Sequence, residues 1–350
     1  MRVMHEILQQ NKEIWDLFTR KEEYSPEKVD EHNRFVFDHD DFKQTLEPEV
    51  SSYLVKHGFK VDFPENKNFA VCLTHDVDDI YPPLSHTVLS SAHYLKNLNF
   101  QNSAAQLLWR LRGKEYSPYL NLPEIMSLEA GYNAKSSFYC ITAEMDPVRF
   151  RYNIEDMESQ LGEVSDKGWE IGLHGGYYSY NNLEEIKKEK SRLENVLGKK
   201  VLGFRNHYLR FKTPESWELL AEAGFKYDST FGYYDRAGFR NGMCHPFIPY
   251  NLNTGKEINI LEIPLCIMDT ALFNYMHLDF QQAWEYTKNL IDTAEKFNGV
   301  ITLLWHNFVF SCNFRTDWVK LYEKVLQYCS EKGAWITSGE EIYRWWENRS

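Results

Sequence analysis

The sequence predicts an α/β fold built on a parallel sheet, and two observations support this prediction. Apolar runs of strand length recur along the chain, and from residue 136 onward almost every one is followed by a segment of helical length. Strand-then-helix units repeated in this way form parallel sheets with right-handed crossovers. Six to eight such units suggest a distorted (β/α) barrel, which can be incomplete.

The chain divides into an N-terminal part and a barrel part. Residues 1–66 are polar with some helical apolar spacing, which predicts a mostly helical appendage. Residues 67–350 carry the barrel, with a long helical insertion at about 80–131 between the first two strands. In this insertion we expect one or two helices over Leu84–Arg112, and a helix over Leu122–Gly131 that ends on a C-cap glycine.

The strands and helices of the barrel are bounded by glycines, prolines and changes of apolar period. Strands are expected over Phe69–Leu73, Ser136–Thr142, Trp169–Leu173, Val201–Phe204, Tyr227–Thr230, Asn259–Cys266, Val300–Trp305 and Trp335–Thr337. Helices are expected over Asp156–Lys167, Leu183–Leu197, Pro214–Ala223, Phe280–Phe297, Asp317–Glu331 and Glu340–Trp346. Between them, Gly232–Gly255 is rich in glycine and proline and predicts a long loop over one end of the sheet.

Composition excludes several classes of function. The 350 residues are 43% hydrophobic and 15% aromatic, which predicts a substantial core and argues against disorder. A net charge of -12 argues against a nucleic-acid partner. There is no apolar run of 18 residues, so we expect no membrane span. No signal-peptide core and no CxxC spacing are found, which favours a cytoplasmic protein; the sequence predicts no oligomeric state.

The stretch Phe69–Asp79 is the centre of the predicted site. An apolar strand runs into Asp76, Asp78 and Asp79, at the carboxyl end where α/β proteins place their chemistry. Asp76 and Asp78 share one side if the strand continues, and neighbouring carboxylates favour a cation or a shared proton. A solvated turn is the alternative. Asp79 is a spare ligand or a turn residue, and His75, which alternates away from Asp76, is expected to support the ligands from behind.

Three further predicted strands end on histidine or arginine. His174 follows the strand Trp169–Leu173, Arg205 and His207 follow the next strand, and His306 follows Val300–Trp305. A single histidine at a strand end is more often structural than functional. Because parallel strands end at one edge of the sheet, however, these side chains can meet the aspartates without being close in sequence.

Taken in order, these stretches resemble the motifs of a known family. They are Thr74-His-Asp-Val-Asp78, the region of His174, Arg205 to Tyr208, and Leu303-Leu-Trp-His306. The pattern is similar to the polysaccharide deacetylase (NodB-homology) superfamily, and within it to divergent members associated with surface-polysaccharide synthesis. The resemblance covers residues 68 to 345 without the insertion. It implies a distorted (β/α) barrel and metal-dependent removal of N-acetyl groups from sugars.

The resemblance also implies roles for single residues. Asp76 would be the catalytic base, and Arg205 would orient it. The backbone near Tyr208 would help to hold the oxyanion of the tetrahedral intermediate. His306 would be the general acid that protonates the leaving amine.

The metal ligands depart from the family pattern. The resemblance implies Asp78 and His174 as ligands, with a second histidine four residues after the first, but this position is Tyr178. A phenol of pKa about 10 is a poor ligand because it must first lose its proton. His207 lies two residues after Arg205, on the same side of a regular strand. It either restores the second imidazole or only hydrogen-bonds Asp76 or the substrate. Nitrogen and oxygen ligands suit Zn²⁺, although other transition ions also fit.

The predicted loop over the sheet has an aromatic and basic character that suits a sugar ring or a diphosphate-linked carrier. A loop packed only on itself is the alternative reading. The side chains concerned are Tyr233, Tyr234, Arg240 and His245.

The sequence therefore predicts a metal-dependent hydrolase of carbon–nitrogen (amide) bonds, of deacetylase type. Its substrate would be an N-acetylated sugar or a carrier-linked saccharide, such as a polysaccharide precursor. Two alternatives stay open. One is a catalytically degenerate carbohydrate-binding or assembly protein on the same fold, which Tyr178 motivates. The other is an amidase that acts on a non-sugar amide such as a cyclic ureide.

Overall fold

A single curled sheet of parallel strands forms the centre of the computed structural model, which describes residues 2–37 and 44–349. Its order is β8-β5-β4-β3-β2-β1-β10-β9, and β11 pairs with β1 off this path. Every pairing is parallel. The strands are β1 (Ala70–Val77), β2 (Ser137–Ile141), β3 (Glu170–Gly175), β4 (Gly203–Asn206), β5 (Tyr227–Asp228), β8 (Leu261–Glu262), β9 (Ile267–Met268), β10 (Val300–Leu304) and β11 (Trp335–Thr337).

The two edges of this sheet belong to one short segment of chain. The strand expected over Asn259–Cys266 is present only as β8, which pairs with β5 on one edge, and β9, which pairs with β10 on the other edge, was missed in the sequence. Pro264 lies between them and has no N–H to give to a ladder. The segment therefore changes partner there and links both edges, which confirms a distorted, incomplete (β/α) barrel.

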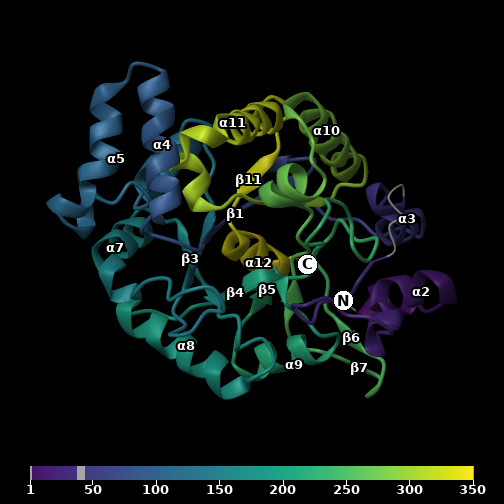
Figure 1. Cartoon of the computed structure of the whole chain (residues 1–350). Helices are drawn as coiled ribbons and strands as arrows, with labels where there is room; N and C mark the ends of the chain where they lie inside the picture. The colour runs from purple at the N-terminus through teal and green to yellow at the C-terminus, as the bar shows by residue number, and fades with distance from the viewer. Residues whose placement is uncertain (1, 38–43, 350) are drawn as a thin grey trace.

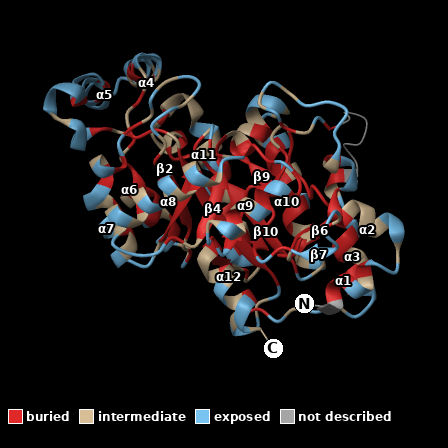
Figure 2. Cartoon of the chain, turned by 90° about the horizontal axis from the view of Figure 1, so that it is seen from below, coloured by how far each residue is buried: buried red, intermediate tan, exposed pale blue. Residues whose placement is uncertain are grey.

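Helices surround the sheet as an outer ring (Figure 1). Every expected helix of the barrel is present, with ends shifted by no more than two residues. Apolar side chains from the helices and the sheet make the core, which Figure 2 shows as buried colour along the middle of the molecule. The ring consists of α6 (Leu122–Ala130), α7 (Glu158–Asp166), α8 (Leu183–Leu197), α9 (Glu215–Glu222), α10 (Phe280–Lys296) and α11 (Thr316–Glu331). The last helix, α12 (Gly339–Asn348), lies in the middle of the ring in Figure 1.

The N-terminal residues pack directly on the barrel. Their helices are α1 (Arg2–Leu8), α2 (Lys12–Thr19) and α3 (Glu49–Lys56). The apolar faces of these helices join the larger core cluster, and each fully buried large side chain contributes about 1.5–3 kcal/mol. A domain boundary at residue 66 stays a prediction. The buried residues concerned are Met4, Leu8, Phe18, Val50 and Leu54.

The insertion after β1 forms a helical hairpin of α4 (Leu84–Lys96) and α5 (Phe100–Arg112), which projects from the barrel in Figure 2. A small antiparallel ribbon of β6 (Tyr250–Asn251) and β7 (Lys256–Glu257) lies in the loop before β8. Short helical turns connect the larger elements. They are η1 (Lys21–Tyr24), η3 (Gln44–Leu46), η4 (Pro64–Asn66), η5 (Lys114–Tyr116), η6 (Ile154–Met157), η7 (His207–Leu209), η8 (Ala271–Tyr275, a π-helix), η9 (Asn307–Ser311) and η10 (Asn313–Arg315).

A buried carboxyl group lies at the amino end of the sheet, opposite the predicted site. Glu170, the first residue of β3, accepts hydrogen bonds from Tyr227 (2.6 Å), Ser137 (2.6 Å) and the backbone N–H of Glu340 at the start of α12 (2.7 Å). Burial, and then the charge of Glu340, raise the pKa of Glu170 to about 7. The folded protein therefore holds this carboxyl better protonated than ionised.

The unaltered protein should lose stability as pH rises from about 4.5 to 7. We expect Glu170→Gln to abolish this loss. The pKa of Glu170 is higher folded than unfolded, so its protonated form stabilises the fold at low pH and this stability is lost as pH rises. The full difference is on the order of 3 kcal/mol. Urea unfolding of both proteins at pH 4.5 and 7.5 measures it. Glu184→Gln, at an 83% exposed side chain, is the control; an equal response in the two variants would contradict the assignment to Glu170.

Candidate metal centre and active site

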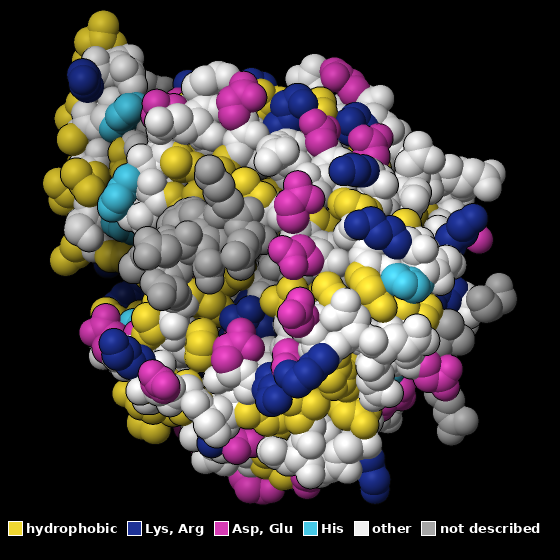
Figure 3. Space-filling view, turned by 90° about the vertical axis from the view of Figure 1, so that its right-hand side faces the viewer, with side chains coloured by type: hydrophobic (Ala, Val, Ile, Leu, Met, Phe, Trp, Pro, Cys, Tyr) yellow, Lys and Arg dark blue, Asp and Glu magenta, His cyan; other side chains and the backbone are white. Residues whose placement is uncertain are grey.

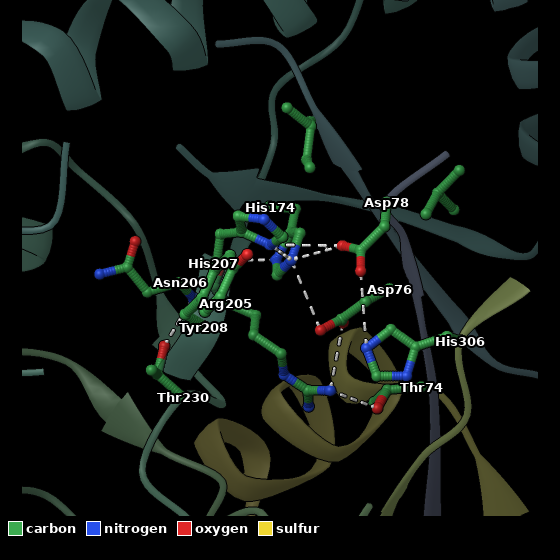
Figure 4. A network of polar contacts seen from close by, with 12 residues as sticks. Thr74, Asp76, Asp78, His174, Arg205, Asn206, His207, Tyr208, Thr230 and His306 are labelled. Atoms are coloured by element: carbon green, nitrogen blue, oxygen red, sulfur yellow. Dashed lines mark hydrogen bonds and ion pairs between the residues drawn. The ribbon is translucent and has the colours of Figure 1, made fainter. Parts of the chain in front are cut away.

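The predicted polar residues meet at the carboxyl ends of adjoining strands (Figure 4). Asp76 lies on β1 and Asp78 directly after it, and His306 lies two residues after the neighbouring β10. His174 is on β3, where it is paired in register with Arg205 of β4. His207 begins η7, immediately after β4. The parallel sheet thus brings these six side chains together, as the strand-end pattern predicts.

Three of these side chains direct one atom each toward a common point. His174 Nε2 and His207 Nδ1 are 3.0 Å apart, and each is 3.3 Å from Asp78 Oδ1. These three residues are the group that could hold a metal ion in the part of the chain that the structure describes. Asp78 Oδ1 is buried and has no hydrogen-bond partner, an arrangement that costs free energy unless a cation is nearby.

The partners of the two imidazoles decide which nitrogen carries the proton. His174 Nδ1 lies 3.0 Å from the carbonyl oxygen of Arg205, so it must donate, and Nε2 keeps its lone pair. His207 Nε2 lies 3.2 Å from Asp146 Oδ2 and donates to it, which leaves the lone pair on Nδ1. With these tautomers, the lone pairs of the two neutral imidazoles and the oxygen of Asp78 point at one another.

This donor set fits a divalent metal ion. Nitrogen and oxygen ligands about 2.0–2.1 Å from a tetrahedral zinc ion are about 3.3 Å from one another, close to the spacing here. Burial alone would lower the pKa of His207, but the charge of Asp78 and the hydrogen bond to Asp146 outweigh it and raise the pKa. A proton thus competes with a metal ion for this position.

Asp76 lies beside the three ligands and is held by Arg205. Its Oδ2 is 3.6 Å from His174 Nε2, and its Oδ1 is 3.4 Å from Arg205 Nη1. The same Nη1 donates to Thr74 Oγ1 at 2.8 Å, and the other guanidinium nitrogens donate to Ser229. Arg205 is fully buried, so these bonds fix its position. Asp76 therefore faces the centre with one oxygen, while Arg205 holds the other.

His306 lies beside Asp76 at the edge of the centre. Its Nδ1 donates to Asp269 Oδ1 at 2.7 Å, and its backbone N–H donates to Oδ2 at 2.8 Å. Its Nε2 is directed at the centre, 3.7 Å from Asp78 Oδ2. Burial would lower the pKa of His306, but the charge and hydrogen bond of Asp269 raise it to about 9. His306 is therefore protonated at neutral pH and can donate a proton from Nε2.

A pocket of about 330 Å³ opens onto these residues, and three regions of the chain build its wall. Arg34 comes from the N-terminal part and His86 from α4 of the insertion. Arg34 donates to the carbonyl oxygen of Tyr208 at 2.9 Å and stacks on Tyr234, 3.6 Å from the ring centre. Tyr208 has a left-handed backbone (φ 61°), which is unfavourable for a tyrosine and needs such support.

Two carboxylates of the site were missed in the sequence. Asp146 follows β2 and orients His207, and Asp269 follows β9 and orients His306. Asp269 directly follows β9, so the strand-end pattern that identified Asp78 could have found it, whereas Asp146 lies farther along the loop after β2. Arg151, whose Nε lies 3.1 Å from Asp146 Oδ2, was also missed in the sequence.

Tyr178 takes no part in the metal centre. Its side chain is 50% exposed and lines a separate pocket beside α8. Asp79 is not a free ligand, because its carboxylate pairs with Arg149 and Arg151. The expected support from His75 is wrong: its ring points to the other face of β1, where it contacts Glu129 and the carbonyl oxygen of Trp305.

The glycine-rich loop contributes one of its four predicted side chains to the pocket. Tyr234 lines it, but Tyr233 packs on Phe37, Arg240 pairs with buried Glu23 at 2.7 Å, and His245 is buried against α3. The other three side chains fit neither alternative, because they are buried against the N-terminal part and not packed on the loop itself. Apolar and ionic contacts with the N-terminal part, which the sequence does not display, decide this.

Two solved structures share this fold. One, assigned to the polysaccharide deacetylases and from Mycobacterium smegmatis, superposes with a TM-score of 0.53 at 19% identity, over 81% of this chain and 92% of its own. The other, described as a probable polysaccharide deacetylase from Pseudomonas aeruginosa PAO1, gives 0.52 at 16% identity, over 85% and 97%. No protein-family model and no curated protein matches the sequence. At this identity the likeness establishes the fold that the resemblance implies.

We expect His207→Ala to weaken zinc binding about as much as His174→Ala does, because each removes one of three converging donors. Loss of a residue that only orients a ligand costs about 10–100-fold in affinity, so loss of a ligand should cost more. Asp146→Asn, which keeps the loop but removes the charge behind His207, should cost about tenfold. Competition with a chromophoric chelator measures all three.

Tyr178→Ala is the matched control, since this side chain lies outside the centre. It should leave the zinc affinity unchanged. An affinity in His207→Ala equal to that of the unaltered protein would remove His207 from the ligand set.

Proposed function

We propose that the protein is a metal-dependent hydrolase that removes an N-acetyl group from an amino sugar or from a sugar-containing polysaccharide precursor. The convergence of Asp78 Oδ1, His174 Nε2 and His207 Nδ1 is the observation that carries this proposal. The fold supports it, because the two similar structures are described as polysaccharide deacetylases.

The three converging residues would hold the metal ion, and zinc suits them best. A divalent ion at this position would polarise the amide carbonyl and lower the pKa of a water molecule beside it. Metal binding must displace the proton that Asp78 and Asp146 favour on His207, so the site should fill more readily as pH rises.

Asp76 is proposed as the general base. Its Oδ2 faces the centre, within reach of a water molecule that attacks the amide carbon. Arg205 holds the other oxygen and so keeps the carboxylate from turning toward the ligands. Because Arg205 is fixed through Thr74 and Ser229, the base has one orientation before substrate binds.

His306 is proposed as the general acid. It carries a proton on Nε2 at neutral pH, and Asp269 keeps the ring oriented through Nδ1. Proton donation to the nitrogen of the breaking amide lets the amine leave, and acetate is the second product. Asp76 and His306 lie beside each other at the edge of the centre in Figure 4, so an amide bound there can contact both.

The pocket wall suits a sugar. Aromatic side chains line it beside the ligands, and rings of this kind stack on the apolar faces of sugar rings. Its volume of about 330 Å³ is at the small end of ligand pockets, which favours one sugar ring with its acyl group at the centre. The aromatic lining residues are Tyr208, Tyr234, Tyr275 and Phe308.

Asp76→Asn should retain metal and lose turnover. The substitution removes the proton acceptor but none of the three donors, so kcat should fall by about 10²–10⁴-fold. Asp78→Asn should lose metal as well. Elemental analysis of both variants, with acetate release from N-acetylated saccharides, separates the roles; equal loss of metal would contradict them.

Protein that takes up no zinc would instead favour a carbohydrate-binding protein, and amine release only from cyclic ureides would favour a non-sugar amidase.

Asp269→Asn should shift the alkaline limb of the kcat profile to lower pH. Asp269 is what raises the pKa of His306, so without its charge His306 loses its proton, and its role as an acid, at lower pH. Metal content should not change. Asp292→Asn, on the remote helix α10, is the control. An alkaline limb that does not move would exclude His306 as the acid.

A further inference from the structure

The hairpin of α4 and α5 is built with its apolar side chains outward. The residues between the helices and beneath them are small or polar: Thr87, Ser90, Ser91, Ser103 and Gln106 are buried, together with Trp109 at the base. Nine large apolar side chains of the hairpin are exposed, up to 83% for Leu111 and 76% for Leu98. They are Leu84, Val88, Leu89, Leu95, Leu98, Phe100, Leu107, Leu108 and Leu111.

This arrangement is the reverse of a hairpin that packs in water, where apolar stripes face each other. Here Ser91 and Ser103 bond across the seam, each hydroxyl donating to the other residue's carbonyl oxygen at 3.4 and 3.1 Å. Small residues and hydroxyl hydrogen bonds between helices, with apolar side chains outside, are typical of helices that pack in lipid.

The exposed apolar surface borders the active-site pocket. His86 of α4 lines the pocket, and the loop that carries Asp146 exposes Met145, Val148 and Phe150 as well. Figure 2 shows the hairpin projecting from the barrel. Figure 3 shows apolar side chains gathered on the projecting part at the upper left, whereas acidic and basic side chains are mixed on the face toward the viewer.

The charge of the hairpin is opposite to that of the protein. Residues 84–116 contain four basic residues, Lys96, Arg110, Arg112 and Lys114, and one acidic residue, so their net charge is +3, against -12 for the whole chain. A basic, apolar surface is complementary to anionic lipid headgroups. A second copy bound through the same surface would place +3 against +3, which argues against a two-fold dimer there.

The hairpin is too short to cross a bilayer. Each helix has 13 residues, about 20 Å, against about 30 Å for the hydrocarbon core. Among the described residues, no helix combines the length and the apolar character of a membrane span. A hairpin of this length can lie in the interface, with apolar side chains among the upper acyl chains and basic ones at the headgroups.

We propose that the α4–α5 hairpin is an interfacial anchor for anionic membranes, which seats the mouth of the active-site pocket on the lipid surface. Resting on the proposed function, the substrate is then an acetylated saccharide attached to a membrane lipid. Such a substrate presents its sugar within reach of the surface, where a free polysaccharide would need no anchor.

Flotation of the full chain with vesicles tests the anchor. In 0.1 M NaCl, the protein should bind vesicles of phosphatidylglycerol and phosphatidylcholine at least tenfold more tightly than vesicles of phosphatidylcholine alone. The variant Leu98→Ser/Phe100→Ser/Leu111→Ser should lose at least tenfold in binding, with an unchanged Tm because these side chains are exposed. The matched control Val29→Ser/Val36→Ser, at exposed apolar positions outside the hairpin, should bind within twofold of the unaltered protein.

Two results would overturn the anchor: no binding to anionic vesicles, or an equal loss of binding in the control variant. If vesicle binding is absent and the hairpin variant abolishes a dimer seen in sedimentation, the surface is a dimer interface instead. The proposed function fails separately. Hydrolysis of a soluble N-acetylated saccharide and zinc content should be the same in the hairpin variant and the unaltered protein. Vesicle binding without any acetate release would leave the anchor standing and reject the deacetylase.

Discussion

The site depends on one constraint, the mutual repulsion of three acceptor atoms held within 3.3 Å of one another. Asp78 Oδ1, His174 Nε2 and His207 Nδ1 can stay so close only if a cation lies among them or a proton replaces it. The fold imposes the arrangement from behind: a backbone carbonyl fixes His174 and Asp146 fixes His207. The surrounding groups, including Arg205 and Asp269, then hold Asp76 and His306 around that point.

The N-terminal part and the insertion after β1 both contribute residues to the site. Arg34 of the N-terminal part holds the carbonyl oxygen of Tyr208, in a backbone conformation that a tyrosine adopts only under restraint. His86 of the insertion lines the pocket from another side. Arg34 and His86 both reach the carboxyl ends of the strands, where the barrel leaves its loops free to vary while the sheet stays fixed.

Residues at the ends of strands could be predicted from the sequence, because strands have a recognisable apolar pattern. The contacts of loop residues could not. Asp76, Asp78, His174, Arg205 and His306 follow or end apolar strands, so their meeting could be predicted from a parallel sheet. The exchange of partners at Pro264 could not, because strand length and apolar content do not say which neighbour a segment pairs with. The loop residues Tyr233, Arg240 and His245 have the composition of a binding site but are buried by the N-terminal part, through contacts distant in sequence.

The turn after β3 contacts the N-terminal part of the chain. The family pattern places a second histidine in this turn, and in this protein the turn binds the N-terminal part. Tyr177 hydrogen-bonds His32 at 3.0 Å, and Arg210 donates to the carbonyl oxygens of Tyr177 and His32.

His32, which lies two residues before Arg34, also packs on Tyr208, with 4.7 Å between the ring centres. A turn that binds the N-terminal part in this way holds Tyr178 outward, where it cannot reach the centre. The second imidazole of the cluster comes from the next strand end, where Asp146 holds His207.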